Sequence, residues 1–430
     1  MDLNRRMTGI RLLLLLIVVS LAYIIWGICG ALLPPFFPAE AKSKGATLSQ
    51  SGFVFGIFSL AGFISSPFFG KYGSMMSPRF LYIPSALIIA ASTFAFGALH
   101  FIHDLYLFLS LSYILRILSG MANAAAWGSL LAALITIFPD KVAKIVAASE
   151  FFYGIGYMLG PVIGAFFYNS GGFILPFEVI GALALIISIL MFVVIPNVNA
   201  SPTEDKSYAE FSSMKLMKIP GVLLSLFDTF LASLGLGMIE GMMGLHLQSI
   251  GATLNIVSVG FFILGSCYMI STVISGLIAD KISTPTLLSI IGNVGQILAF
   301  FIIGPLPFLP IEPNVTLSFL GLALYGFFMG LVYVSSFTRA EKSATENGFP
   351  ENTRTYQLIS GLWIASDLMG KFLGASMGGI VVEVLGFRAT TLVFWIPYLF
   401  MLGADIIDFN FKDRHHSNIP LQYTKINSFD

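Results

Sequence analysis

Charged residues and cysteines are scarce in this chain. Only 10% of its 430 residues are Asp, Glu, Lys or Arg, whereas a soluble domain carries about 25%. The net charge is zero and there is no basic block, which excludes a nucleic-acid partner. Cys29 and Cys267 fall in apolar stretches, which excludes a disulfide framework. No nucleophile–base cluster or metal-ligand spacing is present, so we expect no enzyme, no catalytic residue and no bound metal.

Long apolar runs fill the chain instead. Hydrophobic residues make up 57% of it. A helix of about 20 apolar residues crosses a bilayer, and runs of this kind recur along the whole sequence. They lie at roughly 12–36, 49–70, 80–101, 105–137, 145–168, 173–195, 220–247, 255–279, 285–307, 315–338, 355–383 and 387–408. We therefore expect an all-α membrane protein with twelve transmembrane helices.

A glycine pattern recurs in the fifth and eleventh runs. The longest polar gap, at 196–218, separates two sets of six runs. The repeated positions, 214 residues apart, are Gly156, Gly160 (followed by Pro161) and Gly164, and Gly370, Gly374 and Gly378. Two parallel six-helix repeats are typical of a transporter whose site lies between its halves at mid-membrane. Glycines at this spacing also occur wherever transmembrane helices pack closely, so gating and structural roles both remain open.

The polar segments and basic residues indicate the organisation of the chain. We expect a first bundle at 1–195, a cytoplasmic central loop at 196–218, a second bundle at 219–408 and a cytoplasmic tail at 409–430. Of the 22 Lys and Arg residues, 17 lie on the side of the N-terminus and three on the other side, with Arg116 and Lys371 inside the runs. Because cytoplasmic loops are enriched in Lys and Arg, both termini are expected in the cytoplasm.

Asp367 and Lys371 lie one helical turn apart inside the run 355–383. An ionisable side chain near the bilayer centre costs at least about 2.5–3.5 kcal/mol unless it has a partner or a water-filled cavity. The i,i+4 spacing puts both groups on one face of the helix. We interpret this face as lining a path for a polar substrate or a proton. The alternative is a salt bridge that only holds the helix against its neighbours.

Other polar residues within the runs are candidate site residues. Glu240 is an isolated acid, which suits reversible protonation and makes it a candidate cation or proton site. Arg116 needs a partner, and Glu150 on the next run is the candidate, for coupling or for structure. Asp228 is expected to be structural or gating. Four interior aromatic residues would form an amine-binding pocket by cation–π contact or serve ordinary packing: Trp26, Tyr153, Tyr157 and Trp363.

Twelve spans in two parallel halves resemble the major facilitator superfamily. The sequence Gly276-Leu-Ile-Ala-Asp280-Lys281 is similar to that superfamily's cytoplasmic loop signature, which implies a gating or structural role for Asp280. Arg116-Ile-Leu-Ser-Gly120 is similar to its arginine motif for proton coupling. Residues 156–164 resemble the span-five motif of drug and amine antiporters. The resemblance implies a secondary transporter that works by alternating access.

A closer resemblance covers nearly the whole chain. Residues 35–46, 304–307, 346–349 and 360–363 are similar to the vesicular polyamine transporter branch of the vesicular amine transporter family. This implies exchange of lumenal protons for cytosolic organic cations such as polyamines or monoamines, with the proton gradient as energy source and no cofactor. Glu240 falls at the family's span-seven carboxylate, and Asp367 at the span-eleven aspartate of its monoamine members. Lys371 belongs to neither pattern and would neutralise Asp367.

Two alternatives stay open at this point. One is a transporter of the same fold for an organic anion or a neutral solute, with Arg116 and Lys371 as substrate groups and Glu240 as the proton site. The other is a transport-dead interaction protein.

In the tail, Tyr423-Thr-Lys-Ile426 resembles a tyrosine-based sorting signal, which implies a clathrin adaptor as partner. We therefore expect a vesicular or endosomal membrane, with the plasma membrane as the alternative.

Overall fold

The computed structural model describes most of the chain. The described ranges are 9–73, 78–138, 142–195, 213–279, 285–305, 310, 312–350 and 353–417. Every regular element within them is a helix, which confirms the expected all-α class. Asp280, the Tyr423-Thr-Lys-Ile426 motif and residues 196–212 of the expected central loop lie outside the described residues.

Twelve helices in the described ranges are long and apolar enough to cross a membrane. The first six are α1 (Gly9–Ala31), α3 (Leu48–Gly73), α4 (Pro78–Ala98), α5 (Leu105–Ile137), α6 (Val142–Gly171) and α7 (Ile174–Val194). The second six are α9 (Pro220–Ser249), α10 (Leu254–Ala279), α11 (Thr286–Ile303), α12 (Val315–Glu346), α13 (Thr353–Leu385) and α14 (Phe387–Ser417). Three short helices lie between them: α2 (Phe37–Ser43), η2 (Leu99–Phe101) and α8 (Ser213–Leu216). The twelve helices match the twelve expected runs, and the protein is a multi-pass integral membrane protein.

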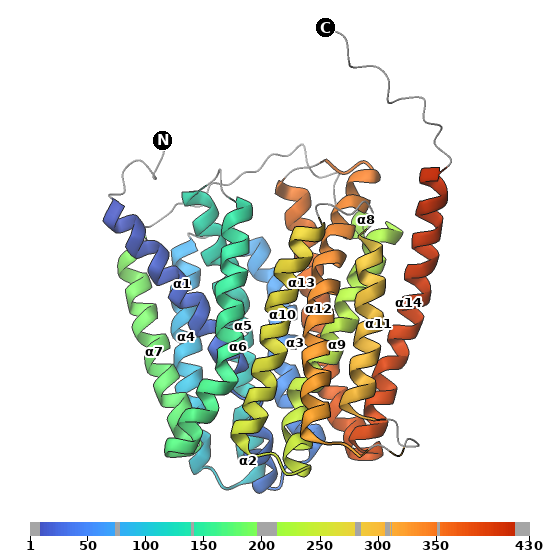
Figure 1. The fold of residues 1–430 in the computed structure, drawn as a ribbon. Coiled ribbons are helices and arrows are strands. Elements are labelled where there is room, and N and C mark those ends of the chain that lie inside the picture. The colour runs from blue at the N-terminus through green and yellow to red at the C-terminus, as the bar shows by residue number, and fades with distance from the viewer. Residues whose placement is uncertain are drawn as a thin grey trace.

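The helices stand side by side in one bundle (Figure 1). The beginning of α1 and the end of α14 lie at one end, which we call the terminus end, and α2 lies at the opposite end, which we call the loop end. Two helices extend furthest beyond their apolar runs. α12 continues to Glu346 and α14 to Ser417, so the tail expected from 409 begins as a helix. Hydropathy predicts only the part of a helix that lies in lipid. Because neither glycine nor proline follows these two apolar runs directly, each helix continues beyond its run.

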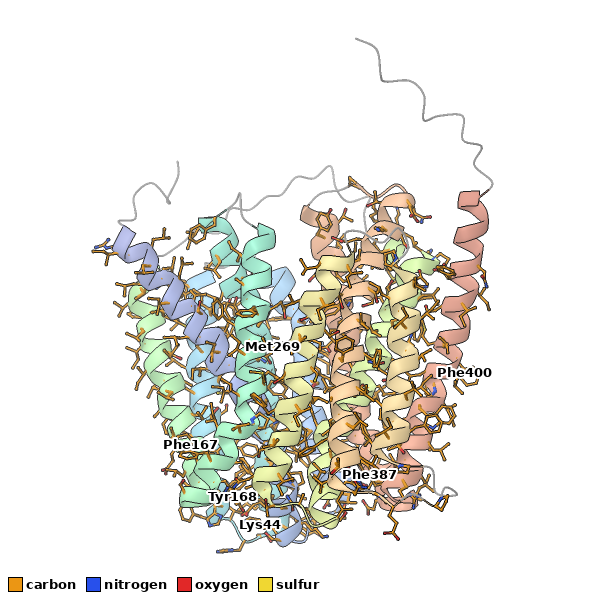
Figure 2. All side chains as sticks on the ribbon, in the orientation of Figure 1. Lys44, Phe167, Tyr168, Met269, Phe387 and Phe400 are labelled. Atoms are coloured by element: carbon orange, nitrogen blue, oxygen red, sulfur yellow. The ribbon has the colours of Figure 1, made fainter. Side chains whose placement is uncertain are left out.

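Large apolar side chains cover the outside of the bundle. Val193 of α7, Leu277 of α10 and Phe400 of α14 are 73%, 68% and 77% exposed, and Figure 2 shows Phe400 pointing outward from its helix. Soluble proteins seldom expose apolar surface on this scale. These faces therefore suit contact with lipid, which also explains why the backbone is helical: in a bilayer each N–H and C=O group must find its partner within the protein.

The repeat seen in the sequence extends to the end of one helix in each half. Gly172 follows α6 and Gly386 follows α13, and the two glycines are 214 positions apart. Their φ angles are +72° and +79°, a region that side chains with a Cβ rarely adopt. The next helix starts directly after each turn. Each half therefore makes the same glycine turn between its fifth and sixth membrane-spanning helices.

The repeated glycines lie where two helices of the same half touch. A Cβ at Gly156 would meet the Ile24 carbonyl group of α1, and a Cβ at Gly374 would meet the Leu234 carbonyl group of α9. Gly160 also faces α1, and Gly370 and Gly378 face α9, whereas Gly164 faces Leu32 and Phe36 in the turn that follows α1. Small residues allow this close approach and stabilise transmembrane helix pairs. The same pairing, α6 on α1 and α13 on α9, therefore occurs in each half, with Pro161 inside α6.

Gly374→Ala is expected to destabilise the protein, whereas Gly403→Ala is not. A methyl group at Gly374 would overlap the Leu234 carbonyl group, whose helix backbone cannot easily move, so overpacking should cost about 1–3 kcal/mol. An added Cβ at Gly403 of α14 has nothing within 4 Å, and Ala favours a helix over Gly by about 1 kcal/mol. Thermal unfolding in detergent should show a lower midpoint for the first variant only. Equal midpoints would contradict the close packing of α9 and α13.

Candidate functional site

Asp367 and Lys371 form an ion pair on α13. The Lys371 Nζ atom lies 3.1 Å from the Asp367 Oδ2 atom, and the two side chains are 24% and 13% exposed. The i,i+4 spacing places both groups on one face of the helix, as the sequence predicts. The pair is thus shielded from bulk solvent but open enough to exchange a partner.

The second oxygen of Asp367 is held by two further helices. Ser233 of α9 donates its hydroxyl hydrogen to Asp367 Oδ1 at 2.7 Å, and the hydroxyl group of Tyr333 on α12 also donates to this oxygen. Trp363, one turn before Asp367, packs edge-on against the Tyr333 ring with 4.9 Å between centroids. Its indole N–H donates to Ser336 at 3.1 Å. Three helices of the second half therefore fix the position of this carboxylate.

Glu240 lies where the two halves of the protein meet. It belongs to α9, and the hydroxyl group of Tyr157 on α6 donates a hydrogen bond to its Oε1 atom. Lys371, Asp367 and Arg116 are the charged groups that act electrostatically on it. Glu240 therefore combines a direct link to the first half with electrostatic contact to the ion pair on α13.

Arg116 does not pair with Glu150, which corrects the pairing expected from the sequence. Its Nε atom donates to the Val54 carbonyl oxygen at 3.2 Å, and its guanidinium group lies 4.3 Å from the centroid of the Phe58 ring. At a rise of 1.5 Å per residue, Arg116 is about 32 Å from the terminus end of α5, and Glu150 about 12 Å from the terminus end of α6. The two side chains lie at different depths. The acid that acts on Arg116 is Glu240, while exposed Glu150 is influenced by the pair on α13.

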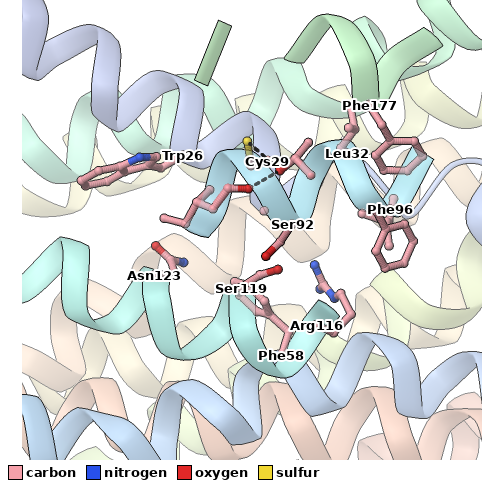
Figure 3. Close-up of a pocket in the computed structure, with 14 residues that line it drawn as sticks. Trp26, Cys29, Leu32, Phe58, Ser92, Phe96, Arg116, Ser119, Asn123 and Phe177 are labelled. Atoms are coloured by element: carbon pink, nitrogen blue, oxygen red, sulfur yellow. Dashed lines mark hydrogen bonds between the residues drawn. The ribbon is translucent and has the colours of Figure 1, made fainter. Parts of the chain in front are cut away.

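A small cavity adjoins Arg116 inside the first half. It has a volume of about 30 Å³, enough for one or two water molecules. Figure 3 shows Arg116, Ser92 and Ser119 directed into it from α5 and α4, with Trp26 of α1 at its edge. Trp26 is 3% exposed. It therefore lies in the first half, apart from Trp363 beside the ion pair.

The remaining aromatic candidates link these regions. Tyr153 packs edge-on against Trp127, with 5.0 Å between ring centroids, and its ring lies 6.1 Å from that of Tyr157. Tyr157 in turn contacts Glu240. Tyr153 and Tyr157 thus adjoin each other in the first half, whereas Trp26 lies at the small cavity and Trp363 beside the ion pair of the second half. Among these four residues, Tyr157 donates a hydrogen bond to a candidate binding group.

Sequence reasoning missed a buried ion-pair cluster in the second half. Arg339, expected in a cytoplasmic loop, lies inside α12 and is 1% exposed. Its guanidinium group binds Asp228 of α9 at 3.2 Å and, on α14, Asp405 at 2.6 Å and Asp408 at 3.0 Å. Three acids in apolar runs, each in need of a partner, were the signal that could have placed Arg339 among them.

Hydrogen bonds join the two halves at the loop end. Asn169 of α6 donates to Asn255 of α10 at 2.5 Å. Glu383 of α13 accepts bonds from the backbone N–H and the hydroxyl group of Ser49 on α3, at 3.0 and 2.5 Å. The halves are therefore fastened together on the loop-end side of Glu240.

This arrangement suits binding of cations and protons. Glu240 and Asp367 are partly buried acids, and the positively charged group of Lys371 already occupies Asp367. A positively charged substrate or a proton can replace Lys371 at Asp367, because either one restores the charge balance.

Comparison with known proteins agrees with the fold. A model of the Major Facilitator Superfamily matches residues 15–350. The chain is 31% identical to the MFS-type transporter SLC18B1 of Homo sapiens over 364 residues, which cover 84% of this chain and 78% of that protein. It is 23% identical to the synaptic vesicular amine transporter of Mus musculus over 365 residues, 82% of this chain and 65% of that protein. These relatives are transporters rather than enzymes.

Solved structures share the same architecture. A mutant of the nucleoside transporter NupG superposes with a TM-score of 0.72 at 14% identity, over 92% of this chain and 99% of that one. A bacterial homologue of the human lysosomal transporter Spinster superposes with a TM-score of 0.72 at 13% identity, over 93% and 97% of the two chains. At such identities the likeness concerns the fold. Together with the family match and the human relative, it shows that this chain belongs to the Major Facilitator Superfamily.

Proposed function

We propose that the protein is a proton-coupled antiporter of organic cations such as polyamines or monoamines, working by alternating access. The observation that carries this proposal is the position of Glu240, an acid that binds Tyr157 across the interface of the halves and acts on the Asp367–Lys371 pair. Carboxylates at the interface of two repeats are typical sites for coupling ions and cationic substrates. The similarity to the synaptic vesicular amine transporter supports an amine as substrate class.

Lys371 has the role of an internal cation in this mechanism. Its ammonium group holds Asp367 at 3.1 Å until an ammonium group of the substrate replaces it. The exchange conserves the local charge, so it avoids the cost of an unpaired ion in a poorly hydrated site. Ser233 and Tyr333 keep the carboxylate in place during the exchange.

Glu240 has the role of the proton site. A hydrogen bond to a charged carboxylate is roughly twice as strong as one to a neutral group, so protonation of Glu240 weakens its link to Tyr157. That link joins α6 to α9 and therefore the two halves. Arg116 acts on the proton site through its positive charge. Glu150 lies closer to the terminus end than Asp367 does, counted along their helices.

The remaining expectations concern the membrane and the partners. We propose that the terminus end faces the cytoplasm, given the excess of Lys and Arg on that side. The protein would then take substrate from the cytoplasm into a vesicular or endosomal lumen. The Tyr423-Thr-Lys-Ile426 motif would bind a clathrin adaptor as a short extended peptide.

The test is uptake of labelled spermidine into proteoliposomes with and without an acidic interior. Uptake that depends on the gradient supports the antiport. Uptake that ignores the gradient contradicts the proton coupling, and no uptake under any gradient favours the anion or neutral-solute alternative or the interaction protein.

Lys371→Ala is expected to lower both KM and kcat for a cationic substrate. Without its internal competitor, Asp367 should bind the substrate more tightly, by about tenfold for each 1.4 kcal/mol of lost competition, and release it more slowly. Initial rates of uptake over a range of concentrations measure both constants, and Lys371→Arg, which keeps the charge, is the matched control. Unchanged KM and kcat would contradict the proposed exchange of Lys371 for the substrate. If the protein takes up an anionic solute and Lys371→Ala abolishes that uptake, the result would support the alternative with Arg116 and Lys371 as substrate groups.

A further inference from the structure

A closed ring of polar groups lies in the second half, nearer the terminus end than Asp367. Asn293 of α11 donates its two amide hydrogens to Asp228 Oδ1 and Asp405 Oδ2, both at 2.9 Å. Arg339 donates from one nitrogen to Asp228 Oδ2 at 3.2 Å and to Asp405 Oδ1 at 2.6 Å. All four carboxyl oxygens thus accept one N–H each. We call Asp228, Asp405, Asn293 and Arg339 the carboxyl ring.

The carboxyl ring is fully buried and contains more acid than base. Asp228 and Asp405 are 0% exposed and Arg339 is 1% exposed. The second guanidinium nitrogen of Arg339 donates to Asp408 at 3.0 Å, so one positive charge faces three carboxyl groups. The other acidic and basic residues of the four helices that form the ring are Glu240 and His246 on α9, Glu341, Lys342 and Glu346 on α12, and Arg388, Lys412, Asp413, Arg414, His415 and His416 on α14. Helix α11 has none.

Two adjacent buried carboxyl groups cannot both carry a charge at low cost. Asp228 and Asp405 share both of their N–H donors, so the two carboxyl groups face the same amide nitrogen and the same guanidinium nitrogen. Two carboxyl groups held together in this way can share one proton, as in the paired aspartates of aspartic proteases. A metal ion fits poorly, because all four oxygens face N–H donors, and no group of His, Cys, Asp or Glu side chains among the described residues is placed to hold a metal ion.

Unpartnered polar atoms beside the ring indicate how a proton reaches it. The Oδ1 atom of Asn293 and the Nε atom of Arg339 have no hydrogen-bond partner, and neither has either amide atom of Gln296, one turn further along α11. Asn293 and Gln296 are 0% exposed. Buried acceptors and donors of this kind are usually satisfied by water. Water at these atoms can carry a proton to and from the carboxyl groups.

Polar groups lie between the ring and the ion pair on α13. Thr229, next to Asp228, bonds to Ser336 at 2.9 Å. One turn further along α9, the Ser233 hydroxyl group donates to Asp367 at 2.7 Å and lies 2.5 Å from the Tyr333 hydroxyl group. These groups form a polar seam between α9 and α12, and the serines and the threonine in it are 0% exposed.

We infer that Asp228 and Asp405 form a second proton-binding site, in which the two carboxyl groups share one proton between the amide group of Asn293 and the guanidinium group of Arg339. With that proton the carboxyl pair carries one negative charge, which Arg339 balances. The site is separate from Glu240 and Asp367, and it does not depend on the substrate assigned to them.

Infrared spectroscopy of the full-length protein in detergent or lipid tests this site without any transport measurement. A protonated carboxylic acid has a C=O stretching band that an ionised one lacks. The wild type at neutral pH should show such a band, and labelling the aspartates with ¹³C at the carboxyl carbon should shift it. Asp228→Asn and Asp405→Asn should each remove the band, because the remaining carboxylate then ionises against Arg339. Asp408→Asn, Asp367→Asn and Ser336→Ala are the controls that should keep it.

The outcomes separate this site from the proposed antiport. A label-sensitive band that is lost in both ring variants and kept in the controls supports the shared proton, whether or not the protein takes up spermidine. Absence of a label-sensitive band in the wild type overturns the inference, and this arm needs no variant to fold. A band that survives Asp228→Asn or Asp405→Asn, or that disappears in Asp367→Asn, also overturns it.

Discussion

Glu240→Gln is expected to reduce gradient-driven uptake of an organic cation strongly while leaving the fold intact. Gln keeps the shape of the side chain and an acceptor for the Tyr157 hydroxyl group, but it cannot take up a proton. Coupling between two ligands typically amounts to about 1–3 kcal/mol, or roughly 5–150-fold in affinity, so the uptake that an acidic interior drives should fall by a factor in this range. Initial uptake of labelled spermidine with and without the gradient measures the loss.

A matched acid and a second assay separate the roles of Glu240. Glu178 lies in α7 and is exposed on the outside of the first half, so Glu178→Gln should leave uptake unchanged. Exchange of labelled for unlabelled substrate at equal pH should persist in Glu240→Gln if the acid only carries the proton, and should disappear if it also binds the cation. Gradient-driven uptake at the wild-type rate in Glu240→Gln would contradict the proposed proton site.

Arg339→Met is expected to reduce stability by about 3–5 kcal/mol, the usual cost of removing one partner from a buried ion pair. Met approximates the length and volume of the Arg stem, so the loss reflects charge more than packing. Asp228, Asp405 and Asp408 would remain with no guanidinium group among them. The midpoint of thermal unfolding in detergent should drop sharply, and the yield of folded protein should fall with it.

Two further variants make this prediction specific. Arg11→Met, at an exposed position at the start of α1, should leave the midpoint unchanged. Adding Asp408→Asn to Arg339→Met should recover part of the loss, because the cluster then holds one fewer negative charge. A midpoint for Arg339→Met equal to that of the wild type would show that the cluster does not support the fold.

The sequence predicted the fold and the ion pair because both follow from local patterns. Twelve apolar runs fix twelve helices, and an i,i+4 spacing fixes which face Asp367 and Lys371 share. Both inferences depend only on bilayer thickness and helix geometry. The glycines 214 positions apart were enough to indicate two similar halves.

Contacts between distant helices could not be predicted in this way. The pairing of Arg116 with Glu150 was wrong because the two residues, although on neighbouring runs, lie about 20 Å apart along the helix axes. Tyr157 and Glu240 are 83 positions apart and no periodicity connects them. Arg339 was assigned to a loop because its apolar run ends before its helix does.

The placement of Asp367 and Lys371 on one helix has a consequence for the timing of transport. Their ion pair can open by a change of side-chain rotamer alone, without movement of one helix against another. Such changes take picoseconds to nanoseconds, whereas rocking of domains takes microseconds to milliseconds. Competition for Asp367 therefore reaches equilibrium many times within one transport cycle. Selectivity between amines would depend on relative affinity at this carboxylate, and the turnover rate would depend on the slower motion of the two halves.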